Sequence, residues 1–154
     1  MGQKRLLVVY HSKDGKTGRL AKALYKGATD TELTIDCRFK TAVESDKDDL
    51  LWSDGIIFGT PENFGYMSGA LKDFFDRTFY EVEGQLEGKP YCIFIGAGND
   101  GTGALSSIRR ICNGYKFREV LEPVIVVGEL REEDIDRCQE LGLAMAAGLE
   151  AGIF

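Results

Sequence analysis

Five short apolar segments alternate with segments of helical spacing along the whole chain. The apolar segments are residues 5–10, 33–39, 55–60, 91–95 and 120–127. Strands that alternate with helices are typical of a parallel sheet, because each connection must cross over one face of the sheet. The length of 154 residues suits one such domain. We therefore expect a single α/β domain over residues 1–154.

Apolar spacing also predicts the connecting helices. The strongest apolar stripe runs from Met67 to Phe79, and the weakest helical signal lies in residues 41–51. We expect the first helix to end at Gly27 and the helix after the fourth strand to end at Gly114, because glycine is frequent just beyond a helix. The acidic turn at residues 132–134 favours the start of a last helix.

The strands differ in pattern, which predicts their order in the sheet. Strands one, three and four are continuous apolar runs, as expected for central strands covered on both faces. Residues 33–39 alternate between apolar and polar, and residues 120–127 contain Pro123, so both segments suit edge positions. The prediction is a three-layer flavodoxin-like α/β fold with a five-stranded parallel sheet of order 2-1-3-4-5.

Three loops of this predicted sheet share an unusual composition. Residues 11–18 (HSKDGKTG), 59–69 (GTPENFGYMSG) and 96–103 (GAGNDGTG) follow strands one, three and four, and all are rich in glycine and small polar residues. The loop after strand two has no such enrichment. Ligands of open α/β sheets bind at the carboxyl ends of the strands, where the strand order reverses. The three loops therefore predict a ligand site.

Residues 96–101 match the dinucleotide pattern G-x-G-x-x-G letter for letter. That pattern belongs on the first turn of a βαβαβ unit, whereas here it follows the fourth strand. Glu119 follows Gly101 at nearly the spacing of the acidic residue that binds the ribose in dinucleotide-binding folds. However, Glu119 precedes a predicted strand instead of ending one. We therefore interpret these glycines as a place where the backbone approaches a flat ligand.

The first loop favours a phosphate. The hydroxyls of Ser12 and Thr17 stand with exposed amides at a predicted helix N-terminus, where oriented donors and the helix dipole hold anions. The alternative is an ordinary strand–helix turn. In the second loop, a flat ligand can stack on the rings of Phe64 and Tyr66. The alternative is that the Phe64 ring fills the core beneath the loop.

Residues 60–78 read T-P-x-x-F-G-x-M-S-G-x-L-K-x-F-x-D-R-T. This stretch resembles the middle segment of flavodoxin-like FMN proteins, most closely the branch of NAD(P)H-dependent quinone and FMN reductases. Residues 12–17 are similar to the phosphate loop of that family, [ST]-x-T-G-N-T. The resemblance covers the whole chain in architecture.

The resemblance implies one FMN, with its phosphate on the first loop and its ring between the other two. The implied FMN-binding residues are Ser12, Lys13, Asp14, Gly15, Lys16, Thr17, Thr60, Pro61, Glu62, Asn63, Phe64, Gly65, Ala97, Gly98, Asn99, Asp100 and Thr102. No catalytic side chain is required, because the flavin supplies the chemistry. No metal site is expected, because His11 is the single histidine and no cysteines are paired in sequence.

Two departures from the family pattern bear on the site. Asp14 stands where threonine is usual, so we expect weaker or more salt-sensitive FMN binding, although Lys13, Lys16 and Arg19 can compensate. Residues 98–101 contain no aromatic, which leaves one flavin face open to a nicotinamide or a quinone. Acidic Glu62 and Asp100 beside the ring are expected to lower the flavin potential.

The expected function is an NAD(P)H-dependent oxidoreductase that passes electrons through FMN to a quinone or similar acceptor. One alternative is a flavodoxin-type electron carrier that docks on basic redox proteins, favoured by the small size and the net charge of −6. Another is a non-flavin phosphate-binding module. An acidic chain without a long apolar segment predicts a cytoplasmic monomer or homodimer that binds neither nucleic acid nor membranes.

Overall fold

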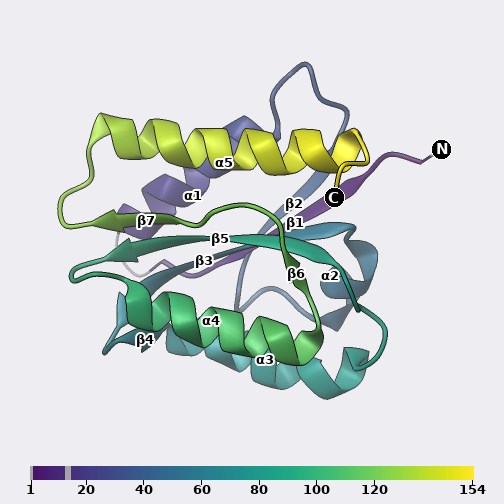
Figure 1. Ribbon diagram of the computed structural model, residues 1–154, viewed down its shortest axis with the longest axis horizontal. Coiled ribbons are helices and arrows are strands. Elements are labelled where there is room, and N and C mark those ends of the chain that lie inside the picture. Colours follow the sequence, from purple (N-terminus) through teal and green to yellow (C-terminus); the bar gives the residue numbers. More distant parts are fainter. Residues whose placement is uncertain (1, 13–14) are drawn as a thin grey trace.

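The computed structural model describes residues 2–12 and 15–154 (Figure 1). The parallel strands are β1 (Arg5–Tyr10), β2 (Asp36–Thr41), β3 (Gly55–Asn63), β5 (Pro90–Ala97), β6 (Arg118–Glu119) and β7 (Val124–Val127). The sheet order is β2-β1-β3-β5-β6, with β7 also beside β5, and the short β4 (Tyr66–Met67) pairs antiparallel with β3. The predicted flavodoxin-like fold is confirmed. The numbering of the strands differs because β4 was not predicted and the fifth strand is split.

The split in the fifth strand follows from its sequence. β6 pairs with the start of β5, β7 pairs with its end, and Pro123 lies directly before β7. Proline has no N–H to donate to a ladder, so the strand breaks there. The second strand begins at Asp36 instead of residue 33, because the amide of Thr34 donates to a carboxylate oxygen of Glu150 instead of to β1.

The helices form a layer on each face of the sheet (Figure 1). Helices α1 (Lys16–Ala28) and α5 (Glu132–Glu150) cover one face and pack on Leu6, Val8 and Phe94. Helices α2 (Lys47–Trp52), α3 (Gly69–Val82) and α4 (Thr102–Tyr115) cover the other face. Within residues 2–12 and 15–154, every helix is too short or too polar to span a bilayer.

Two predicted helix ends were wrong. Gly27 lies inside α1, where a Cβ would overlap the Gln139 carbonyl oxygen of α5, and a Cβ on Gly142 would overlap the Leu24 carbonyl oxygen of α1. These two glycines therefore allow the backbones of α1 and α5 to approach each other closely. Gly114 lies inside α4, which ends one residue later.

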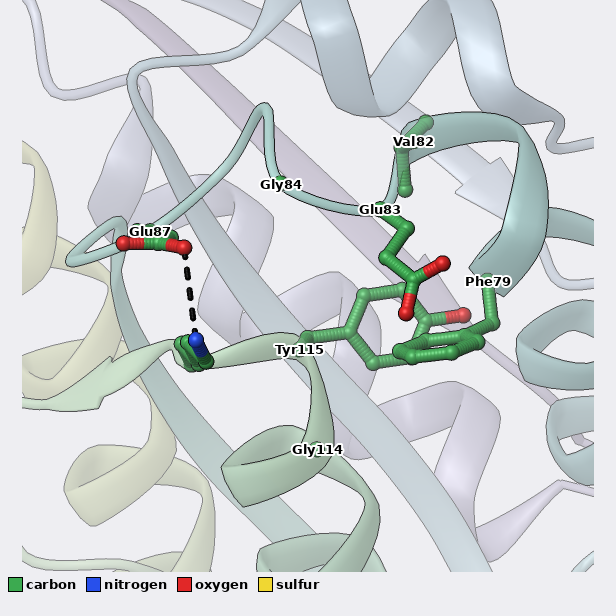
Figure 2. Close-up of a pocket in the computed structure, with 8 residues that line it drawn as sticks. Phe79, Val82, Glu83, Gly84, Glu87, Gly114 and Tyr115 are labelled. Carbon is green, nitrogen blue, oxygen red and sulfur yellow. Dashed lines mark hydrogen bonds and ion pairs between the residues drawn. The ribbon is translucent and has the colours of Figure 1, made fainter.

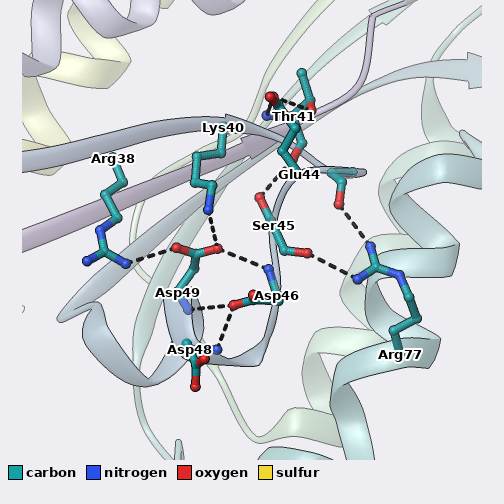
Figure 3. A network of polar contacts seen from close by, with 10 residues as sticks. Arg38, Lys40, Thr41, Glu44, Ser45, Asp46, Asp48, Asp49 and Arg77 are labelled. Carbon is teal, nitrogen blue, oxygen red and sulfur yellow. Dashed lines mark hydrogen bonds and ion pairs between the residues drawn. The ribbon is translucent and has the colours of Figure 1, made fainter.

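A polar network ties the edge strand β2 to the short helix α2 (Figure 3). The buried carboxylate of Asp49 accepts from Arg38 at 2.9 Å, from Lys40 at 2.8 Å and from the Asp46 amide at 3.0 Å. The Arg38 guanidinium also lies 4.0 Å from the centre of the Trp52 ring. This network explains how residues 47–52, with few apolar positions, still form a helix on the sheet.

Candidate functional site

The three glycine-rich loops meet at one edge of the sheet. β1, β3 and β5 are parallel neighbours, so their carboxyl ends point the same way, to the left in Figure 1. The His11 amide donates to the Gly59 carbonyl oxygen at 3.1 Å, and Pro61 stands opposite Gly96 in the sheet. The structure therefore brings together the segments in which the sequence predicted a ligand site.

The first loop leads into α1 through a tight turn. Gly15 has a φ of 99°, which strongly favours glycine, and the Ser12 hydroxyl accepts from the Gly18 amide at 3.0 Å. A Cβ on Gly96 would lie 2.9 Å from the hydroxyl oxygen of buried Thr17, so the end of β5 fits closely beneath the first turn of α1. The predicted site residues Lys13 and Asp14 lie outside the described residues.

The amino end of α1 differs from those of the other helices. In the described part of the chain, carboxylates accept hydrogen bonds at the amino ends of α2, α4 and α5, and the Ser68 hydroxyl caps α3. The N-cap of α1, Gly15, has no side chain to offer, and its first turn contains no acidic residue. Within the described residues, Gly18 is the one first-turn residue whose amide has a side-chain acceptor, the Ser12 hydroxyl. The positive end of this helix dipole therefore suits an anion.

The second loop is a β-hairpin that the sequence did not predict. Glu62 pairs with Met67 and Asn63 with Tyr66, which leaves Phe64 and Gly65 as the turn. Their φ values are 53° and 68°, as in the type I′ turns that favour Asn-Gly. Phe64 is fully exposed, so the alternative in which it plugs the core is wrong.

Two hydroxyls hold the base of this hairpin. The buried Thr60 hydroxyl donates to the Pro61 carbonyl oxygen at 2.7 Å and accepts from the Ser68 amide at 2.9 Å. The hydroxyl of Ser107 on α4 accepts from the Met67 amide at 3.1 Å. The Thr60 side chain is thus engaged within the protein.

The third loop, residues 97–102, is joined to the hairpin by Glu62. Its two carboxylate oxygens accept from the amides of Gly101 at 3.2 Å and Ala104 at 3.1 Å. Close packing accompanies these bonds, because a Cβ on Gly103 would overlap the Gly65 carbonyl oxygen. The loop after β3 therefore rests directly on the amino end of α4.

Asp100 also caps α4. Its carboxylate accepts from the backbone amide of Thr102 at 3.0 Å and from its hydroxyl at 2.8 Å, and these two hydrogen bonds lower the pKa of Asp100. Gly98 and Asn99, just before it, are exposed. The charges of Glu62 and Asp100 are therefore balanced in part by the α4 dipole.

Lys16 belongs to the loop predicted to bind the FMN phosphate, and its ammonium contacts two carbonyl oxygens. The Nζ atom donates to Ala97 O at 2.7 Å and to Gly128 O at 2.6 Å. Burial lowers the pKa of Lys16. The side chain thus connects the first turn of α1 with the ends of β5 and β7, a role that no sequence pattern indicated.

A cavity of about 110 Å³ lies elsewhere, between the ends of α3 and α4 (Figure 2). Phe79, Gly84 and Tyr115 line it, and the segment 83–89 leads into the amino end of β5. It is smaller than the roughly 300 Å³ at which ligand pockets begin. It lies at the opposite edge of the sheet from the three loops and is no part of their site.

Comparison with known proteins identifies a family and several relatives. The family model described as NADPH-dependent FMN reductase matches residues 6–131. A flavodoxin of Aquifex aeolicus is 32% identical over 158 aligned positions, which cover 92% of this chain and 85% of that protein. An NAD(P)H dehydrogenase (quinone) of Acidithiobacillus ferrooxidans is 36% identical over 111 positions, 59% of this chain and 56% of that protein.

Solved structures show the same fold. A flavodoxin from the domain Archaea superposes with a TM-score of 0.81 at 22% identity, covering 94% of this chain and 98% of that one. The fold and the family model together define a flavodoxin-like FMN protein. The chain belongs to the NADPH-dependent FMN reductase family. This confirms the prediction of FMN as cofactor and of an FMN-dependent NAD(P)H oxidoreductase, and it disfavours a non-flavin module.

Proposed function

We propose that the three loops hold FMN and that the protein passes electrons from NAD(P)H through this flavin to a quinone or a similar small acceptor. The amino end of α1 carries the proposal. Within the described residues it receives no carboxylate, its N-cap is a glycine, the Ser12 hydroxyl occupies only the Gly18 amide, and it adjoins two glycine-rich loops. A phosphate fits such an end.

Backbone groups do most of the binding in this proposal. The first-turn amides of α1 and the hydroxyls of Ser12 and Thr17 would hold the phosphate. Backbone groups of residues 60–65 and 97–102 would hydrogen-bond the polar edge of the ring. FMN held there would supply the hydride and electron transfer, so the protein's own residues would supply position and electrostatics.

The two ring faces differ in cover. Phe64 stands exposed on a short hairpin and can lie over one face of the ring. Residues 98–101 contain no aromatic side chain, so the other face stays open. An open face gives a nicotinamide and then a quinone access to the flavin, which favours a reductase.

Anaerobic mixing of the FMN-loaded protein with NADH or NADPH tests this function. Rapid bleaching of the flavin absorption, followed by recovery on addition of a soluble quinone, is the expected result. Protein that takes up no FMN would contradict the cofactor site. Flavin that is bound but stays oxidised with both nucleotides would contradict the reductase.

An electron carrier is the second candidate function. The net charge of −6 suits docking on basic redox proteins, and the relative from Aquifex aeolicus is named a flavodoxin. Bound flavin that NAD(P)H does not reduce, but that a partner reductase reduces quickly, would favour this function. We expect a cytoplasmic monomer or homodimer in either case, and all four cysteines are free thiols, as suits a reducing compartment.

A further inference from the structure

The Lys16 ammonium is engaged within the protein. Its stem passes the end of β5, with Cγ and Cε 3.6 and 3.5 Å from the position of a Cβ on Gly96. Two of its three N–H donors reach the carbonyl oxygens of Ala97 and Gly128 at 2.7 and 2.6 Å.

The Ala97 carbonyl is held from two sides. Besides Lys16, the Gly128 amide donates to it at 3.0 Å, and Gly128 follows β7 directly. The oxygen therefore points toward β7. None of the described peptide bonds is cis, so the N–H of the next residue, Gly98, points the opposite way.

That opposite direction is the side of β3 and its hairpin, because β5 lies between β3 and β7. Among residues 2–12 and 15–154, no atom accepts a hydrogen bond from the Gly98 amide. Gly98 also has open space around it. A donor without a protein partner thus faces the gap between the hairpin and residues 97–102.

We propose that Lys16 is a positioning residue that aims the Gly98 amide at the polar edge of the flavin ring by holding the Ala97 carbonyl toward β7. This inference rests on the proposed flavin site. It gives Lys16 a role toward the ring and not toward the phosphate. It also means that the third loop has its binding conformation before the flavin arrives.

Titrations with FMN and with riboflavin, which lacks the phosphate, test this role in K16M and in the control K22M, which removes the same charge from an exposed position of α1. K16M is expected to weaken the binding of both flavins by the same factor, roughly tenfold, the scale of one hydrogen bond in a binding site. K22M is expected to change neither more than about twofold.

Weaker FMN binding with unchanged riboflavin binding would make Lys16 a phosphate counter-charge and overturn the proposal. Unchanged binding of both flavins would overturn it as well. A wild-type protein that binds neither flavin would overturn the proposed function itself, which separates the two failures.

Hydrogen exchange of the flavin-free protein gives a readout that needs no flavin. The amides of residues 97–103 and of Gly128 are expected to exchange faster in K16M than in the wild type, while those of α3 stay unchanged. Equal exchange in both proteins would overturn the anchoring role. K16Q, a smaller change, takes the place of K16M in both experiments if K16M does not fold.

Discussion

The carboxylate of Glu62, at the end of β3, accepts a hydrogen bond from the Gly101 amide at the start of α4 at 3.2 Å. With its second bond, to the Ala104 amide, it acts as a helix cap supplied by a distant part of the chain. The capped helix end and the hairpin form two walls of the proposed flavin site, so one side chain serves both stability and binding.

Removal of this cap is expected to destabilise the protein. E62A leaves two amides of α4 without their acceptor and should lower the free energy of unfolding by about 1–2 kcal/mol, as for other lost caps. Urea denaturation measures the change. E140A, at an exposed position of α5, is the control and should stay within about 0.5 kcal/mol of the wild type. Equal midpoints for E62A and the wild type would contradict the capping role.

Phe64 is expected to lower the stability of the protein and to strengthen flavin binding. It holds a φ of 53°, which is costly for a bulky residue, whereas Asn-Gly is the favoured sequence of a type I′ turn. F64N should therefore raise the free energy of unfolding by about 0.5–1 kcal/mol and weaken flavin binding. Thermal unfolding of the flavin-free protein and a flavin titration measure the two effects. A variant that is both less stable and fully able to bind would refute this account.

Thr17 is expected to act on the phosphate alone. T17V keeps the shape of this buried side chain and removes its hydroxyl, so FMN binding should fall roughly tenfold, as for one charge-assisted hydrogen bond. Riboflavin binding should not change, which provides an internal control. Fluorescence titration with both flavins separates the cases, and equal weakening of both would place Thr17 outside the phosphate site.

The contact between α1 and α5 is expected to tolerate no side chain at Gly27. G27A brings a methyl group onto the Gln139 carbonyl oxygen and should destabilise the fold by about 2–3 kcal/mol. G114A is the matched control, because a Cβ there meets nothing within 4 Å inside α4, and it should stabilise by up to about 1 kcal/mol. Similar unfolding temperatures for the two variants would contradict this assignment.

Asp49 is expected to make stability depend on acid pH. Its burial raises the pKa, but hydrogen bonds from Lys40, the Asp46 amide and Arg38 outweigh burial and lower the pKa below 3.8. A carboxyl with a lowered folded pKa stabilises the protein above its unfolded pKa, and this contribution is lost as the pH falls through the folded pKa.

The wild type should therefore lose stability as the pH drops below about 4, and D49N should lose less over the same range. D49N is also expected to be about 2 kcal/mol less stable at pH 7, because Lys40 and Arg38 lose their partner while staying partly in water. Urea unfolding from pH 7 to pH 3 measures both effects. Parallel pH profiles for the two proteins would rule out this role of Asp49.

The sequence predicted the layers, the order of the strands and the three loops, because apolar periodicity reports which face of an element is buried. It misassigned Gly27. A glycine that ends a helix and a glycine that lets a second helix pack closely cannot be told apart in sequence, because the packing partner, here Gln139, is known only from the structure. It missed the hairpin at Phe64 because Phe-Gly is not a usual turn sequence. The contacts of Lys16 and Glu62 span 112 and 42 residues, so no local pattern could reveal them.

The two outer strands of the sheet have a further consequence. On one side, β2 carries Arg38 and Lys40, both held by Asp49; on the other, the strand is broken into two and four residues around Pro123. Charged side chains, proline and short strands all oppose the addition of a foreign strand. Neither border offers a long, uninterrupted template, so the domain should resist fibril-like association even when crowded.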